Sequence, residues 1–164
     1  GLLDAFLQDG YSVVIQGMRG CPYSCTFCFA SKLEIEKFSD KRVVDEIDYV
    51  YEKTKCSTLI LTDDNFGLYK RDIEIAKKVK GLYEERGYPS TLNIYYSKKP
   101  TKIVVEISKI LGALAPFFIS YQSRNEKTLD AIKRYNLVDD NSRALIQYST
   151  SSARSKGDSN VLQR

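Results

Sequence analysis

Residues 19–28 read Arg-Gly-Cys-Pro-Tyr-Ser-Cys-Thr-Phe-Cys. They hold three cysteines with three and then two residues between them: Cys21, Cys25 and Cys28. Gly20 and Pro22 indicate a loop, which is a poor setting for three unligated core cysteines. Thiolates at this spacing can bind one iron–sulfur centre, and three ligands leave one coordination position free, as in catalytic metal sites. The stretch therefore favours an enzyme over a binding module.

The number of cysteines and histidines in the chain limits which metal centre these thiols can form. The 164 residues include four cysteines and no histidine, so a zinc site would lack its usual fourth ligand. Cys56, the other thiol, stands just before an apolar run and is predicted to be a small buried residue at the start of a strand. A disulfide framework is disfavoured, because three clustered thiols and one distant thiol make no balanced set. An iron–sulfur cluster fits best.

The cysteine run, with Phe27 directly before its last cysteine, resembles the cluster motif of the radical S-adenosylmethionine (radical SAM) superfamily. Further segments are similar to the cobalamin-binding branch of that superfamily. They are residues 15–28, residues 61–67 (Leu-Thr-Asp-Asp-Asn-Phe-Gly), and residues 119–123 with residues 129–136. The resemblance implies a partial, incomplete TIM-like parallel β/α barrel.

The resemblance also implies two cofactors. Family members hold a [4Fe-4S] cluster through the three cysteines, here Cys21, Cys25 and Cys28, and the amine and carboxylate of SAM bind the fourth iron. An electron passed to the cluster cleaves SAM to methionine and a 5′-deoxyadenosyl radical, which abstracts hydrogen from the substrate. Phe27 would lie beside the adenine.

Residues at two further strand ends would contact SAM by this resemblance. The family's glycine-rich acidic motif, which touches the methionine amine, is replaced here by Asp63, Asp64 and Asn65. Residues at the end of the fourth strand would face the ribose or the methionine carboxylate: Ser120, Gln122 or Ser123. Two alternatives stay open: Asp63 and Asn65 are also typical helix caps, and Gln122 is also typical of a hydrogen-bonded amide at a strand end.

Hydrophobic patterns predict an α/β fold in which strands and helices alternate four times. The predicted strands are residues 11–18, 57–62, 91–97 and 116–122. The predicted helices are residues 40–54, 70–86, 102–114 and 126–135. This order predicts a parallel sheet with helical crossovers, that is, about four units of the incomplete barrel.

Helix ends are predicted from capping residues. Ser39 or Asp40 would cap the first helix, and Gly87 would end the second. Ser123 and Glu126 have the spacing of a capping box for the last helix.

Polar residues gather where the predicted strands end. In a parallel sheet the carboxyl ends of the strands meet at one rim, where working residues collect. The cysteine loop and residues 63–65 follow such ends. Alternation places Asn93 and Tyr95 on one face of the third strand, and Ser120 and Gln122 on one face of the fourth, with Ser123 at its tip. Because polar residues in apolar strands are costly unless paired, their simplest use is to hold a polar cofactor.

Composition and charge are those of a single globular domain. With 43% hydrophobic residues, 25 basic and 21 acidic residues and a net charge of +4, the surface is mixed and gives no nucleic-acid footprint. No apolar run approaches the ~20 residues of a membrane helix, and the first residues lack a secretory signal. We therefore expect a cytoplasmic protein without a membrane segment.

The chain is expected to divide near Asn141. Residues 1–141 would form the radical SAM core, and residues 142–164 a polar, disordered tail. The family's partial barrel has six units, so two are expected to be missing from a truncated or frameshifted chain.

The resulting hypothesis is a radical SAM enzyme core acting on an unidentified substrate, either a small molecule or a cell-surface precursor. It requires an electron donor such as flavodoxin or ferredoxin, and a full-length parent would add cobalamin. The second hypothesis is an iron–sulfur electron carrier or structural module with Cys56 as fourth ligand. The third is an inactive fragment with an open barrel edge.

Overall fold

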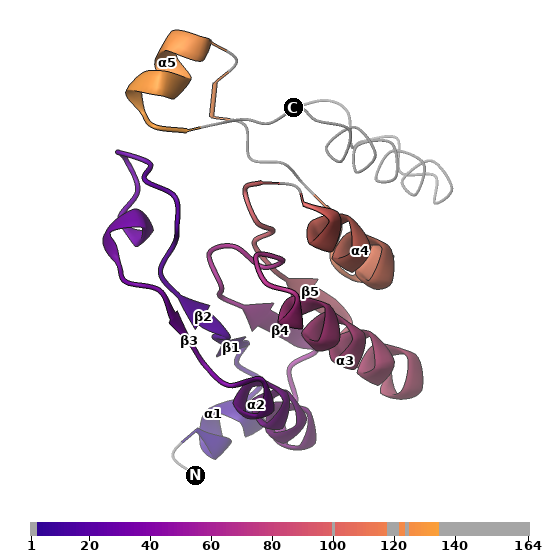
Figure 1. Ribbon diagram of the computed structural model, residues 1–164. Coiled ribbons are helices and arrows are strands. Elements are labelled where there is room, and N and C mark those ends of the chain that lie inside the picture. The colour runs from indigo at the N-terminus through magenta and orange to yellow at the C-terminus, as the bar shows by residue number, and fades with distance from the viewer. Residues whose placement is uncertain (1–2, 100, 118–121, 124, 135–164) are drawn as a thin grey trace.

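The computed structural model describes residues 3–99, 101–117, 122–123 and 125–134, and it shows an α/β fold around a parallel sheet (Figure 1). The sheet has the order β1-β4-β5, with strands at Val13–Ile15, Thr58–Leu61 and Thr91–Asn93. Val13 pairs with Leu59, and Leu59 pairs with Leu92, both in parallel register. The predicted parallel arrangement of the first three strands is confirmed.

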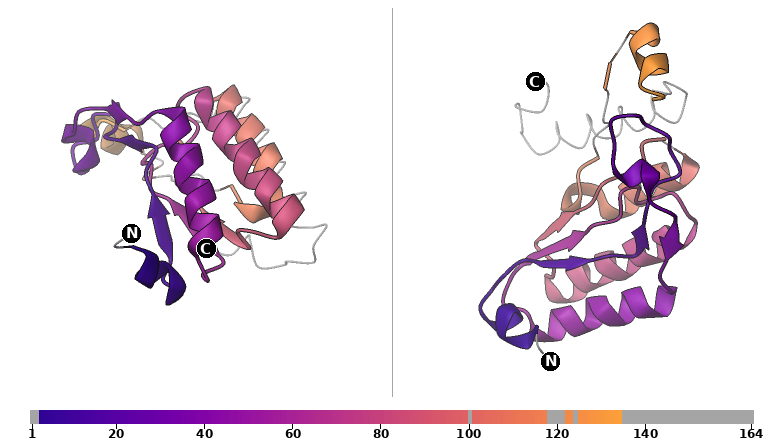
Figure 2. Two further views of the ribbon diagram at one scale, coloured as in Figure 1. Left: turned by 90° about the horizontal axis from the view of Figure 1, so that it is seen from below. Right: turned by 90° about the vertical axis from the view of Figure 1, so that its left-hand side faces the viewer.

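Three helices form the second layer and lie side by side along one face of the sheet (Figure 2). They are α2 (Asp40–Lys53) before β4, α3 (Arg71–Arg86) between β4 and β5, and α4 (Lys102–Leu111) after β5. Each helix buries apolar residues at helical spacing, as predicted. On α4 these are Val104, Ile107 and Leu111, all of which are 0% exposed. The strand–helix alternation is confirmed for three of the four predicted units.

The sheet is covered on one face only within the described part of the chain. Ile15, Leu61 and Leu92 belong to the apolar core between the sheet and the helices and are buried. Val14 and Tyr95, which alternate with buried neighbours, are 62% and 64% exposed. This alternation is typical of strands that bury a single face.

Capping residues define the helix ends. The Ser39 hydroxyl accepts a hydrogen bond from Arg42 N at 3.2 Å, so Ser39 and not Asp40 caps α2. Gly87, with a φ of 70°, ends α3 in the left-handed region, as predicted. The predicted capping box before α5 (Glu126–Ala131) is wrong, because the side chain of Asn125 takes the cap position.

Several short elements were missed by the sequence analysis. They are α1 (Asp4–Gln8), the antiparallel pair β2 (Met18–Arg19) and β3 (Glu36–Lys37), and a 3₁₀ turn at Ala30–Lys32. The helix predicted over residues 102–114 is α-helical to Leu111 and ends in a 3₁₀ turn at Gly112–Leu114. Two-residue strands carry no hydrophobic period. The strand predicted over residues 11–18 ends at Ile15, because the chain leaves the parallel sheet to form β2.

Other predictions fall partly outside the described residues. The fourth strand was predicted over residues 116–122, of which 118–121, including Ser120, lie outside them. The boundary at residue 141 and the tail at residues 142–164 lie outside them as well. The last helix ends at Ala131, short of the predicted residue 135. Within the described ranges, no helix combines the length and apolarity needed to cross a bilayer.

Candidate functional site

The three clustered cysteines lie on a long loop, residues 20–35, between β2 and β3. The two strands pair antiparallel, Met18 with Lys37 and Arg19 with Glu36, so they bring the two ends of the loop together. This cysteine loop extends beyond the carboxyl end of β1, on the side where α5 lies (Figure 1). The predicted position of the cysteines after the first strand is confirmed.

Gly20 opens the cysteine loop in a conformation that favours glycine. Its φ is +83°, and a Cβ added there would clash with the carbonyl oxygen of Glu34. The backbones at the start and end of the loop are therefore in direct contact, which only glycine permits.

The cysteine loop is tightly turned around its last two cysteines. Cys28 N donates to Cys25 O at 3.2 Å, and the Ser31 hydroxyl lies 3.0 Å from Cys25 O and 2.7 Å from Cys28 O. Cys21 and Cys25 are buried and Cys28 is half-buried. All four cysteines of the chain are free thiols.

Two of the sulfur atoms face hydrogen-bond donors from distant segments. Asn65 Nδ2 donates to Cys21 Sγ at 3.1 Å, and the Arg134 guanidinium lies 3.9 Å from Cys25 Sγ. Arg134 follows α5, and this segment is tied to the cysteine loop by a hydrogen bond from Thr26 N to Ile132 O at 3.1 Å. Arg134 was missed by the sequence analysis, which has no local signal for a contact across 109 residues.

A cavity of about 410 Å³ opens beside Cys25. Four basic residues and no acidic residue line it. The full lining is Pro22, Tyr23, Ser24, Cys25, Lys98, Lys99, Lys133 and Arg134. Lys98 also binds residues after β4, because its ammonium group donates to Asp64 O at 3.0 Å and to Asn65 Oδ1 at 3.3 Å. The cavity is therefore suited to an anionic group. Lys98 stands shortly after β5, and this position at a strand end could have marked it as a candidate site residue from the sequence.

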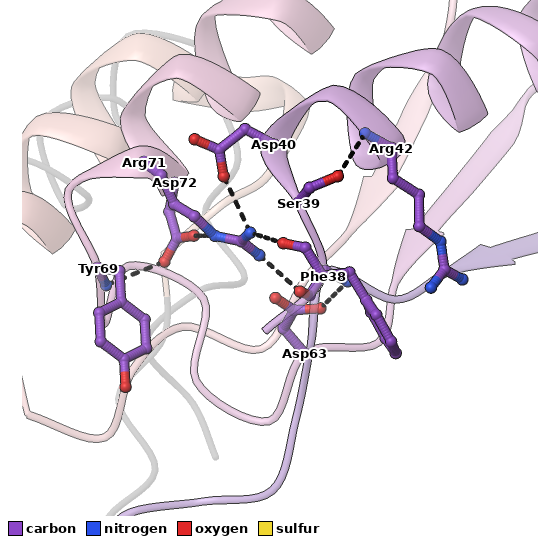
Figure 3. Close-up of polar contacts among 9 residues, drawn as sticks. Phe38, Ser39, Asp40, Arg42, Asp63, Tyr69, Arg71 and Asp72 are labelled. Carbon is purple, nitrogen blue, oxygen red and sulfur yellow. Dashed lines mark hydrogen bonds and ion pairs between the residues drawn. The ribbon is translucent and has the colours of Figure 1, made fainter. Parts of the chain in front are cut away.

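Asp63 and Arg71 hold the base of the cysteine loop (Figure 3). Asp63 is buried, and its Oδ1 accepts a hydrogen bond from Gly17 N at 2.6 Å. Arg71 donates to Gly17 O at 2.6 Å and to Phe38 O, and it pairs with Asp40 at 3.0 Å. Gly17 precedes β2 and Phe38 follows β3, so one guanidinium holds the chain on both sides of the loop.

The charge state of Asp63 depends on its burial. Desolvation raises the pKa of its carboxyl, while hydrogen bonds from the backbone of Met18 and Gly17 and the charge of Arg71 act in the opposite direction. The alternative role of Asp63 and Asn65 as caps of the next helix is wrong. Asp72 serves that segment instead, because its Oδ2 accepts from Gly67 N and Tyr69 N.

The predicted SAM-contacting residues are spread over the rim. Asn65 is fully buried and meets Cys21, whereas Asp64 is half-buried. Phe27 is 56% exposed on the cysteine loop. Gln122 is exposed and Ser123 half-buried ahead of α5, where the Ser123 hydroxyl accepts from Asn125 N.

Cys56 lies at the other end of the sheet. It precedes β4, and its Sγ is 3.6 Å from the hydroxyl of Ser12, which precedes β1. The cysteine loop follows β1, and β1 and β4 are parallel. Cys56 is therefore remote from the other three thiols, which argues against the second hypothesis, in which it is the fourth cluster ligand. It is half-buried, not buried as predicted.

The donor set fits a cluster better than a single ion. Among the described residues, no three cysteine or carboxylate side chains converge closely enough to hold one metal ion. Three thiolates of a [4Fe-4S] cluster bind three different iron atoms, so they need not converge on one point. Cys21, Cys25 and Cys28 lie on one loop that β2 and β3 close, and thiolates are the ligands that such clusters use.

A family model described as the Radical SAM superfamily matches residues 15–148. The chain is 36% identical over 135 residues to the cobalamin-dependent radical SAM methyltransferase TokK of Streptomyces tokunonensis. It is 34% identical over 135 residues to the 2-(S-pantetheinyl)-carbapenam-3-carboxylate methyltransferase of Streptantibioticus cattleyicolor. Each alignment covers 79% of this chain and 20% of the relative, so the chain spans about a fifth of the length of these relatives.

Proposed function

The chain belongs to the radical SAM superfamily, whose members use a [4Fe-4S] cluster and SAM, and on this premise we propose that Cys21, Cys25 and Cys28 hold such a cluster. The observation that carries the proposal is the closed cysteine loop at the carboxyl end of β1, with donors facing the sulfurs of Cys21 and Cys25. When bound, the cluster supplies the electron that cleaves SAM to methionine and a 5′-deoxyadenosyl radical.

The cavity beside Cys25 supports a site for the methionine end of SAM. Lys98, Lys99, Lys133 and Arg134 surround it, and a carboxylate there would be stabilised by charge-assisted hydrogen bonds. We place the carboxylate of SAM in this cavity, where Lys98 is already held by Asp64 O. Holding the sulfonium in one orientation is what the chain contributes to its cleavage.

The remaining predicted contacts are divided by burial. Asp64, Gln122 and Ser123 are accessible enough to meet the amine or the ribose, and Phe27 to stack on the adenine. Ser120, which lies outside the described residues, stays a proposed contact. Asp63 and Asn65 have their side chains engaged by Gly17 and Cys21, so we assign them to positioning the cysteine loop.

Methyl transfer is the reaction class that we propose for the longer protein of which this chain would be the core. The support is that two relatives are named methyltransferases, one of them cobalamin-dependent. In this proposal, cobalamin binds outside the described residues, and a flavodoxin or ferredoxin supplies the electron.

The test is reconstitution of the chain with iron and sulfide without oxygen, followed by reduction and addition of SAM. We expect about four irons per chain and release of 5′-deoxyadenosine. A stable cluster that neither cleaves SAM nor responds to it spectroscopically would favour the electron carrier.

Two variants test the ligand assignment. Cys25→Ala should abolish cluster binding because it removes one of three thiolates, whereas Cys56→Ala, at the other end of the sheet, should retain it. Iron and sulfide contents measure both. Equal iron loss in the two variants would contradict the assignment.

A further inference from the structure

The orientation of the Asn65 side-chain amide is determined by its neighbours. Its Oδ1 accepts from Lys98 Nζ at 3.3 Å and from Lys98 N at 3.5 Å. Turning the amide over would place its NH₂ group against an ammonium group and a backbone N–H, which are donors only. Nδ2 is therefore directed at Cys21 Sγ, 3.1 Å away.

Burial strengthens this contact. Asn65 is 0% exposed and Cys21 is 5% exposed, so water does not compete for either atom. A hydrogen bond in such surroundings is electrostatically stronger than in water. Of the two donor contacts to sulfurs of the cysteine loop, it is also the shorter, at 3.1 Å against 3.9 Å from Arg134 to Cys25.

We propose that Asn65 is a positioning residue that donates a hydrogen bond to the Cys21 thiolate and thereby raises the reduction potential of the cluster. The inference rests on the proposed function, because it requires a cluster on the cysteine loop. Reduction adds negative charge to the cluster and its thiolates, and an N–H donor stabilises that charge. Hydrogen bonds to the sulfurs are among the features that set cluster potentials.

Lys98, in the segment that follows β5, completes the arrangement. Its backbone and ammonium N–H groups hold the Asn65 oxygen, and the ammonium group also holds Asp64 O at 3.0 Å. The segment after β4 is thus fixed relative to the segment after β5 before any cofactor binds. Asn65 needs no reorganisation to donate to Cys21.

The experiment compares the wild type with Asn65→Leu, Asn65→Asp and Gln8→Leu. Leucine removes the donor without adding charge, so this variant decides the comparison. Aspartate keeps the acceptor that Lys98 requires, but its carboxylate also adds a negative charge that lowers the potential by itself. Gln8 is the matched control. Its exposed amide donates to Lys53 O at the end of α2, away from the cysteine loop. Each protein is reconstituted without oxygen, its iron content is measured, and the cluster is titrated with a reductant while electron paramagnetic resonance follows the reduced form.

Both Asn65 variants should load the cluster, because all three thiolates remain, and their midpoint potentials should be more negative than that of the wild type. At a fixed applied potential the reduced fraction should fall several-fold, while Gln8→Leu should match the wild type. Unchanged potentials in two fully loaded Asn65 variants would overturn the inference and leave the proposed function intact. If both Asn65 variants lost the cluster while the wild type and Gln8→Leu kept it, Asn65 would be needed for cluster assembly. That result would also overturn the inference. A wild type that takes up no cluster would refute the proposed function itself.

Discussion

The Asp63 carboxyl is buried behind the base of the cysteine loop, where it accepts a hydrogen bond from Gly17 N at 2.6 Å. Burial raises its pKa above the usual value of 3.8. The folded state therefore favours the protonated carboxyl more than the unfolded state does. The stability that Asp63 contributes is fully present below its unfolded pKa and is lost as pH rises through its folded pKa.

Asp63→Asn removes this titration while keeping an oxygen that accepts from Gly17 N. The free energy of unfolding of the wild type, relative to Asp63→Asn, should therefore fall as pH rises from about 4. Urea unfolding of both cluster-free proteins at several pH values measures the difference. A difference that grows with pH would mean that hydrogen bonds and Arg71 outweigh burial.

At the scale of the elements, the features found from sequence are those with a repeating pattern. Helices α2, α3 and α4 were predictable because their apolar residues recur at helical spacing and are buried together. The pair β2 and β3 was not predictable, because each strand has only two residues. The position of the pair depends on Arg71, which binds Gly17 O before β2 and Phe38 O after β3. The local pattern also gave the wrong cap for α5, since Ser123 and Asn125 are both common caps.

Gly20→Ala should disrupt the cysteine loop. The added Cβ meets the Glu34 carbonyl oxygen and the residue would keep a positive φ, so we expect a loss of unfolding free energy on the order of 2 kcal/mol or more. Cluster loading should fall with it. Denaturant unfolding and iron content are the measurements.

Gly81→Ala is the matched control for Gly20→Ala. Gly81 lies inside α3, and a Cβ added there meets no atom within 4 Å. Alanine should stabilise the helix by about 0.5–1 kcal/mol and leave iron content unchanged. Equal effects of the two substitutions would contradict the requirement for glycine at the contact between Gly20 and Glu34.

Over the whole molecule, the candidate site combines segments that are far apart in sequence. Cys21 and Cys25 were found from their spacing, but their partners Asn65 and Arg134 stand 44 and 109 residues away. A motif reveals which atoms can bind iron, whereas hydrogen bonds to those atoms depend on how strands and helices pack. The parallel sheet could be anticipated from the alternation of patterns, and the arrangement around the sulfurs could not.

The one-sided cover of the sheet gives a stability test. Ile15 faces the apolar core at 3% exposure, and its neighbour Val14 is 62% exposed on the other face. Ile15→Ser should cost about 3 kcal/mol or more of unfolding free energy, and Val14→Ser less than about 1 kcal/mol. Thermal or urea unfolding measures both. Similar losses would mean that the second face is also covered.

The cysteine loop is attached at its base through Gly17, Gly20 and Phe38, and its middle contacts Asn65 and Ile132 from other segments. The side chain of Phe29, directly after the last cysteine of the loop, is 74% exposed, so a substitution there removes none of these contacts. Exposed positions of this kind can thus alter the surroundings of a metal cofactor while the anchored backbone of the loop keeps its architecture.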